Sequence, residues 1–451
     1  MVYSISLNQQ GNPIMANEAT PTAFLWDWDQ SDLTTAVEDM RRLLGNASHL
    51  TAIGDVTLRG VRAAKNSQAA LLAKRLTSSD RATIKSWITE SRLPAERSEA
   101  LLQESEVPLA QTTAILLSRL PALKTLEVQT YDRNDHDEWT QSRPPGDEFL
   151  TLLSQLVASG AAAGSSFSNV ETIKVLVPTP NGDSANEFNF YVYAENILPF
   201  FYLPQIRTLE LHRAEDGGKS IIWPAPHPKP SAATLEELVL SRCQLSEENI
   251  GQLLRASPNL KTFRCGYVID AEYASDWVDL ETLRSSIDTL KASLEELSFA
   301  MTLWTSTAID CGEVGPWGIR GSLGSLKEFT QLTRLSISLP VLLGWETKGS
   351  SNLADVLPEG LQALTITNEM FFWWHYQWDD LDWEEDDPVV PMWQSLEGKI
   401  VEYLENRPRN LKELRLEISM VGEEQRAEEL KANLIGKGSE AGVIVTVELK
   451  P

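Results

Sequence analysis

Cysteine, long apolar runs and basic residues are all scarce in this chain of 451 residues. Its three cysteines cannot supply the disulfide framework on which small secreted domains depend. No segment approaches the roughly 20 apolar residues of a membrane helix, and the polar residues 1–17 lack the basic start and apolar run of a secretory signal. These absences argue against a secreted disulfide scaffold and a membrane protein, and we expect a cytoplasmic or nuclear location with no membrane partner.

Basic residues are few relative to acidic ones. Lys and Arg number 39 against 64 Asp and Glu, which gives a net charge of −25. A surface this acidic repels phosphate backbones, so nucleic acid is not an expected partner. The sequence also lacks a Gly-rich phosphate loop, a nucleophile elbow and a Cys-x-x-Cys pair. It therefore predicts no cofactor and no metal site.

The chain does contain enough apolar sequence for a large core, together with a repeat. Hydrophobic residues make up 42% of it, and a chain of this length holds about three domains or one repeat array. One phrase recurs nine times: an apolar residue, two others, an apolar residue, one other, an apolar residue. The copies are Leu123-Leu126-Val128, Val170-Ile173-Val175, Ile206-Leu209-Leu211, Leu235-Leu238-Leu240, Leu260-Phe263-Cys265, Leu294-Leu297-Phe299, Leu332-Leu335-Ile337, Leu361-Leu364-Ile366 and Leu411-Leu414-Leu416.

The phrase has a specific physical meaning. Its last two apolar residues are two positions apart, so they share one face of a short strand, and the residue between them faces the other side. Between the phrases, Leu and Ile recur at helical spacing, as in 246–256 and 280–290. A strand with a returning helix cannot bury its apolar face alone, so successive units must stack. Residues 53–58 predict a weaker first copy, and residues 443–449 a closing strand.

One unit carries a family resemblance. It runs from Leu235 through Cys243, Ile250 and Leu253 to Pro258-Asn259-Leu260. This pattern resembles the cysteine-containing, ribonuclease-inhibitor-like class of leucine-rich repeat. The chain is similar to fungal F-box and leucine-rich-repeat-like proteins, although it has no recognisable F-box. The resemblance implies an α/β fold: an irregular, horseshoe-shaped solenoid with parallel strands on the concave face and helices outside. Such proteins mostly bind other proteins.

Two regions follow from this interpretation. We expect residues 1–48 to form an N-terminal arm and helical cap, and residues 49–451 to form the solenoid with insertions along its rim. The central residue of each strand should line the concave face as a mixed polar stripe with charges of both signs. Such a stripe is either a solvated inner surface or a recognition surface with charge complementarity. The charged candidates for this face are Glu127, Lys174, Glu210, Arg264 and Arg415.

Tryptophans and histidines mostly follow the strands, where the loops of a solenoid meet at one rim. Aromatic rings beside carboxylates attract ammonium and guanidinium groups, so the rim is a candidate ligand site. Its candidate residues are Trp304, Trp345, Trp373, Trp374, Trp378, Asp379 and Asp380. Long insertions also need small cores of their own, and the same rings could serve as filler there. The acid/base candidates are His136, His212 and His375.

Two functions remain open on this sequence. The first is an intracellular interaction scaffold that recognises a protein or basic peptide through the concave face and the aromatic, acidic rim. The alternative is a small-molecule binder or enzyme whose pocket is built from the rim loops, with a cationic or aromatic ligand. The two differ in whether the rim loops converge into a closed cavity. Whether the protein is an enzyme is not decided by the sequence.

Overall fold

The structure is a computed structural model that describes residues 23–27, 33–45, 47–59, 76–104, 107–129, 146–161, 167–176, 192–224, 228–270, 278–304, 320–344, 350–368, 389–406, 409–418 and 424–449. It is an α/β protein whose long strands pair in parallel with their neighbours, as predicted. The chain divides into two compact units, which are described separately. Unit 1 comprises residues 1–213 and 222–235, and unit 2 comprises residues 214–221 and 236–451. The division predicted between residues 48 and 49 stays a prediction.

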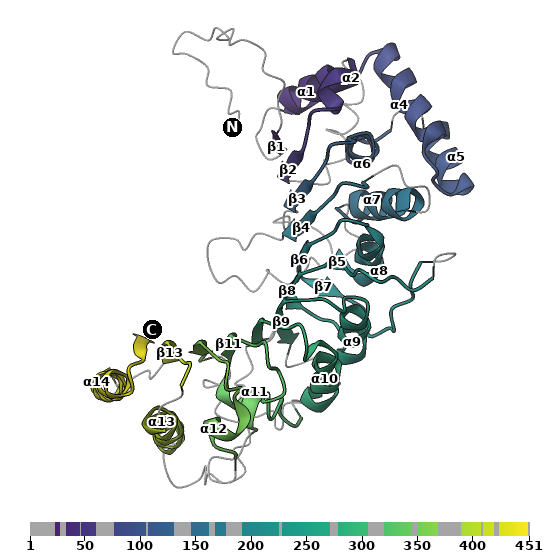
Figure 1. The fold of residues 1–451 in the computed structure, drawn as a ribbon. Helices are drawn as coiled ribbons and strands as arrows, with labels where there is room; N and C mark the ends of the chain where they lie inside the picture. The colour runs from purple at the N-terminus through teal and green to yellow at the C-terminus, as the bar shows by residue number, and fades with distance from the viewer. Residues whose placement is uncertain are drawn as a thin grey trace, which may run out of the picture. The chain divides into compact units, whose positions relative to one another are not determined.

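Unit 1 contains five parallel strands in the order in which they occur along the chain (Figure 1). These are β1 (Ala23–Asp27), β2 (Asp55–Arg59), β3 (Thr125–Gln129), β4 (Thr172–Leu176) and β6 (Thr208–His212); the short β5 (Val192–Tyr193) lies outside this set. The helices are α1 (Leu33–Gly45), α2 (Ala47–Leu50), α4 (Ser78–Glu90), α5 (Ala95–Gln103), α6 (Leu109–Leu117), α7 (Gly146–Ala161), α8 (Ala194–Ile197) and the 3₁₀ helix η2 (Leu198–Tyr202). The segment expected to be an arm and helical cap thus also contributes the strand β1.

Unit 2 contains seven parallel strands, again in chain order. These are β8 (Glu237–Cys243), β9 (Thr262–Asp270), β10 (Glu296–Trp304), β11 (Arg334–Ile337), β12 (Ala363–Ile366), β13 (Glu413–Ile418) and β14 (Ile444–Leu449), preceded by the short β7 (Ala214–Glu215). The helices are α9 (Glu247–Arg255), α10 (Leu280–Ile287), η3 (Asp288–Leu290), α11 (Leu339–Leu343), α12 (Leu353–Val356), α13 (Val389–Glu405) and α14 (Glu424–Ala441). All nine phrases therefore contain a strand.

The phrase also repeats as a hydrogen-bond pattern. A turn brings its first apolar residue into place: the backbone N–H of Leu123 donates to the carbonyl of Leu120, and Leu332 does the same to Phe329. Two successive backbone N–H groups then donate to the same carbonyl of the preceding repeat. Lys124 and Thr125 share that of Gly54 at the start of β3, and the same sharing recurs at the start of β4, β6, β9, β10, β11, β12 and β13. The further shared carbonyls are those of Lys124, Glu171, Glu236, Lys261, Glu295, Thr333 and Gln362.

Burial follows the alternation in most strands; β8 departs from it, because Val239 is buried between Leu238 and Leu240. In β3, Leu126 and Val128 are buried, whereas Thr125, Glu127 and Gln129 are partly exposed. The buried face packs on the helices, which in each unit taken by itself gather along one side of the strands (Figure 1). Hydrophobic burial on that side, at roughly 25 cal/mol per Å² of apolar surface, is the main force that holds each strand to its helix.

Helix caps explain where several helices begin. Thr77 and Asp80 form a capping box at the start of α4: the N–H of Asp80 donates to the Thr77 hydroxyl, and the N–H of Thr77 donates to the Asp80 carboxylate. Asp279 caps α10 by accepting hydrogen bonds from the N–H groups of Glu281 and Thr282. The helices predicted at 246–256 and 280–290 are both present, the second with a final 3₁₀ turn.

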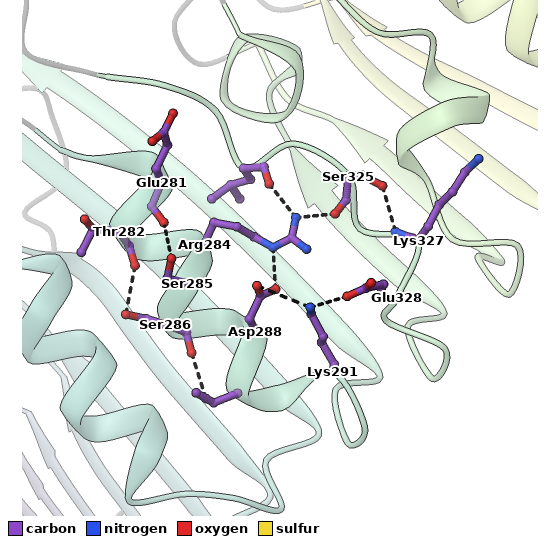
Figure 2. A network of polar contacts seen from close by, with 12 residues as sticks. Glu281, Thr282, Arg284, Ser285, Ser286, Asp288, Lys291, Ser325, Lys327 and Glu328 are labelled. Carbon is purple, nitrogen blue, oxygen red and sulfur yellow. Dashed lines mark hydrogen bonds and ion pairs between the residues drawn. The ribbon is translucent and has the colours of Figure 1, made fainter.

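Side chains on α10 also tie it to the segment that follows β10 (Figure 2). The Arg284 guanidinium donates to the carbonyls of Leu323 (2.7 Å) and Ser325, pairs with Asp288 at 2.7 Å and lies 5.3 Å from the centre of the Phe329 ring. Lys291 pairs with both Asp288 and Glu328. The network holds the segment that leads into β11 against α10 and the turn that follows it.

Candidate functional site

The central residues of neighbouring strands stand in register on the face opposite the buried one. We call this face the ladder face. In unit 1 the register aligns Thr57 with Glu127, Glu127 with Lys174, and Lys174 with Glu210. In unit 2 the aligned residues, from β8 to β14, are Val239, Arg264, Ser298, Ser336, Thr365, Arg415 and Thr446.

The ladder face of unit 1 carries a linked set of charged groups. Lys174 pairs with Glu210 at 2.9 Å, and His212 Nε2 lies 3.2 Å from the other Glu210 oxygen. Burial alone would raise the pKa of Glu210, but hydrogen bonds from Lys174 and His212 outweigh it, so the pKa is lowered. Glu210 is therefore ionised at neutral pH and holds the imidazole in a fixed orientation. Further along this face, the Gln129 amide donates to Glu127 at 2.7 Å.

The ladder face of unit 2 carries two more charged sets. Glu296 binds Arg264 at 2.7 Å and Arg334 at 2.8 Å, and Arg264 also approaches Glu237 at 3.4 Å. Near the end of the sheet, Arg415 pairs with Glu448 at 2.6 Å and lies 3.8 Å from Glu417. Between these sets lie the short side chains of Ser298, Ser336 and Thr365. Apart from Val239, the central residues described on this face are thus polar or charged.

Most of the predicted rim lies outside the described residues. This applies to His136, His375, Trp345, Trp373, Trp374, Trp378, Asp379 and Asp380. Trp304 is the last residue of β10, and only its backbone is described. Of the three histidine candidates, His212 alone falls within the described residues, where it joins Glu210. The rim therefore stays a prediction.

Another tryptophan does have a described environment. Trp223 packs edge-on against Phe201 and Tyr202, with ring centres 5.7 and 6.2 Å apart. Its neighbour Ile222 is 85% exposed. This small aromatic cluster lies in unit 1 beside η2, and it is the kind of local core that a long insertion requires.

Unit 2 buries several titratable groups on its helix side. Cys243 and Cys265 are buried, and burial together with a hydrogen bond to Cys243 raises the pKa of the Cys265 thiol. Burial also raises the pKa of Tyr267, whose hydroxyl has no hydrogen-bond partner within the described residues. Raised thiol and phenol pKa values favour the neutral, unreactive forms, so these residues belong to the core.

Glu247 lies in the first turn of α9 near these groups. Burial raises its pKa to about 7, although its carboxylate accepts a hydrogen bond from the N–H of Asp279 at 3.2 Å. The nearby carboxylates of Glu248 and Asp279 raise it further. Among the described residues, no group of three or more His, Cys, Asp or Glu side chains could hold a metal ion.

Sequence reasoning located the central strand residues but missed the residues two positions before them. Glu237, Glu296 and Arg334 occupy the first strand position and point to the same face as the central residues, because side chains two apart share a face. Aligning the residue that precedes the second apolar position of each phrase would have revealed this acidic and basic set.

Comparisons with known proteins add no family. No protein-family model matches the chain, and no curated protein is similar to it at a significant level. No helix in the described part of the chain is long and apolar enough to cross a membrane.

Proposed function

We propose that this protein is an intracellular interaction scaffold, cytoplasmic or nuclear, that recognises a protein or basic peptide through its ladder face and its aromatic, acidic rim. The observation that carries the proposal is the register of partly exposed polar and charged side chains across successive strands. Charged groups fixed in a row give a partner both orientation and specificity.

The fold proposed with this function is an irregular leucine-rich-repeat solenoid with the ladder face on its concave side. The repeated turn at the start of each phrase and the repeated sharing of one carbonyl by two N–H groups support it. So does the all-parallel pairing within each unit, in chain order, with helices between most successive strands.

Charge exchange on the ladder face tests the scaffold. The double variant Lys174→Glu/Glu210→Lys keeps the ion pair of unit 1 but inverts its pattern, and Arg415→Glu reverses a charge on the ladder face of unit 2. Affinity purification of the tagged protein from its own cells should lose a stoichiometric partner with either variant. The control is Arg92→Glu/Glu99→Lys, which exchanges two exposed charges at the helix side of unit 1. A partner that all variants retain equally would contradict the proposal.

The alternative function, a small-molecule binder or enzyme, is favoured by one contact. Glu210 orients His212 as a carboxylate orients a catalytic imidazole, and His212 remains partly exposed. On this alternative, mass spectrometry of the purified protein should find a small molecule that His212→Gln fails to retain. An identical set of released molecules from both proteins would contradict it.

A further inference from the structure

Glu296 lies between two arginines at the surface of unit 2. Its Oε1 accepts a hydrogen bond from Arg264 Nε at 2.7 Å, and its Oε2 accepts one from Arg334 Nε at 2.8 Å. The side chain of Glu296 is only 16% exposed, whereas those of Arg264 and Arg334 are 46% and 61% exposed. The Glu296 carboxylate therefore lies beneath the two guanidinium groups, which face the solvent.

The way Glu296 binds Arg334 matters for what Arg334 can do. Glu296 occupies the ε nitrogen, and within the described residues the two η nitrogens of Arg334 form no ion pair or hydrogen bond. These two nitrogens donate parallel N–H groups, the geometry that a carboxylate accepts with both oxygens. Burial raises the pKa of Glu296, but the hydrogen bonds from the two arginines outweigh it and lower the pKa. Glu296 thus stays ionised and holds Arg334 in one orientation at neutral pH.

The fold keeps Arg334 at this position. The N–H groups of Thr333 and Arg334 share the carbonyl of Glu295, and the register pairs Glu296 with Arg334. On the helix side, the Arg284 network described above anchors the segment that leads into β11 (Figure 2). A guanidinium that is already oriented loses less conformational entropy when it binds.

The surface beside Arg334 suits an extended chain. Ser298, Ser336 and Thr365 follow one another across β10, β11 and β12, and each is short and partly exposed. Because neighbouring strands lie about 4.8 Å apart, these three residues span a surface roughly 10 Å wide from β10 to β12. Hydroxyl groups on it can donate to and accept from a peptide backbone.

We propose that the ladder face of unit 2 binds an extended peptide segment of a partner protein by seating one of its carboxylate side chains on the η nitrogens of Arg334. The proposal rests on the scaffold function with a protein as the partner, not a basic peptide, and it names the chemistry of one contact. Charge favours a carboxylate over a phosphate. Glu237 and Glu296 already balance the charge of the two arginines, so a dianionic phosphate would be repelled by both carboxylates more strongly than a singly charged carboxylate would. Charge also disfavours a nucleic acid, given the net charge of −25.

Short synthetic peptides provide the probes. A fluorescently labelled peptide that alternates Glu with Ser is compared with analogues carrying Gln, Lys or phosphoserine in place of Glu, by fluorescence anisotropy at low salt. The Glu peptide should bind at least ~10-fold more tightly than the Gln analogue, which corresponds to about 1.4 kcal/mol. Arg334→Gln and Arg334→Lys should each lower its affinity by a similar factor, because Lys keeps the charge but not the paired donors.

Arg255→Gln is the matched control. It removes the same charge from an exposed position in the last turn of α9, away from the ladder face, and should leave binding unchanged. Equal binding of the Glu and Gln peptides, tighter binding of the phosphoserine or Lys peptide, or full binding by Arg334→Lys would each overturn the proposal. If no peptide binds while cells still yield a partner that depends on Lys174 and Glu210, this proposal fails and the scaffold stands. If the Glu peptide binds but no partner is captured, the scaffold fails instead.

Discussion

In unit 2, burial shifts the pKa of individual carboxyl groups and so makes the stability of the fold depend on pH. Glu247 is the clearest case, because its carboxyl is largely withdrawn from water beside Asp279 and Glu248. Its pKa is raised to about 7 in the folded protein, against an ordinary value near 4.5. The folded state therefore binds this proton more tightly than the unfolded state does, and stability falls as pH rises from the unfolded pKa through the folded one.

Glu247→Gln should remove that loss. Glutamine stays neutral and can still accept the Asp279 N–H, so we expect the variant to match the parent protein near pH ~5 and to exceed it near pH ~8 by on the order of 1 kcal/mol. Chemical denaturation at both pH values measures this difference. Glu359→Gln, which removes an equal charge at an exposed position outside α9, serves as the control. A variant that is equally or less stable at the higher pH would contradict the assignment.

Tyr267 leads to a second prediction at this scale. Its hydroxyl is buried and has no hydrogen-bond partner among the described residues, while its ring packs 5.7 Å from that of Phe299. Tyr267→Phe keeps the ring and removes an unsatisfied polar group, so the free energy of unfolding should stay equal or rise by up to about 1 kcal/mol. Thermal and urea unfolding test this. A loss of more than about 1 kcal/mol would show that the hydroxyl is bound after all.

At the scale of elements, the buried strand positions hold each helix to its strand. Leu238 in β8 and Leu297 in β10 have no exposed surface and occupy the same position of the phrase. Replacing either by Ala leaves a cavity, and we expect the free energy of unfolding to fall by about 2–5 kcal/mol. Ile444, the first residue of β14, is 68% exposed, and Ile444→Ala is the control with an effect below about 1 kcal/mol. Near-neutral effects at Leu238 and Leu297 would contradict a shared core.

The start of α4 gives another element-scale prediction. The Thr77 hydroxyl accepts from the N–H of Asp80 at 3.1 Å and also donates to its carboxylate at 2.7 Å. Thr77→Ala removes both bonds and should destabilise unit 1 by about 1 kcal/mol. Thr77→Ser retains the hydroxyl and should behave like the parent protein. Hydrogen exchange along α4 reports the loss directly, and unchanged protection of the first turn in Thr77→Ala would refute the role of the cap.

For the molecule as a whole, net charge is the dominant electrostatic feature. With 64 acidic and 39 basic residues, the folded chain repels itself more than the expanded unfolded chain does. Salt screens this repulsion within about 10 Å at roughly 0.1 M ionic strength, so the melting temperature should rise with added sodium chloride. The exposed ion pairs of the ladder face oppose the trend, yet each contributes only about 0–1 kcal/mol. A melting temperature that falls with salt would show that the ion pairs dominate.

The repeat phrase predicted the parallel strands β2, β3, β4, β6 and β8 to β13, because its last two apolar positions require one buried face. Alternation at residues 443–449 predicted β14. The strand β1 was missed, since Phe24, Leu25 and Trp26 are consecutive and show no alternation. The register also follows from the phrase: successive phrases align residue by residue, so Glu127, Lys174 and Glu210 become neighbours. What the rim residues do stays a prediction, because they fall outside the described residues.

Local pattern by itself thus determined the strands, their buried faces and the order of the central residues, since each depends only on alternation along a few positions. Tertiary structure alone decided the contacts between residues far apart in sequence. Glu296 meets Arg264 and Arg334 from two different strands, and Glu247 meets Asp279 at the start of another helix. The pKa and orientation of such groups depend on burial and on partners about 30 to 40 positions away. A periodic pattern carries no information about either, which is why the carboxylate-bound arginines emerged only from the folded protein.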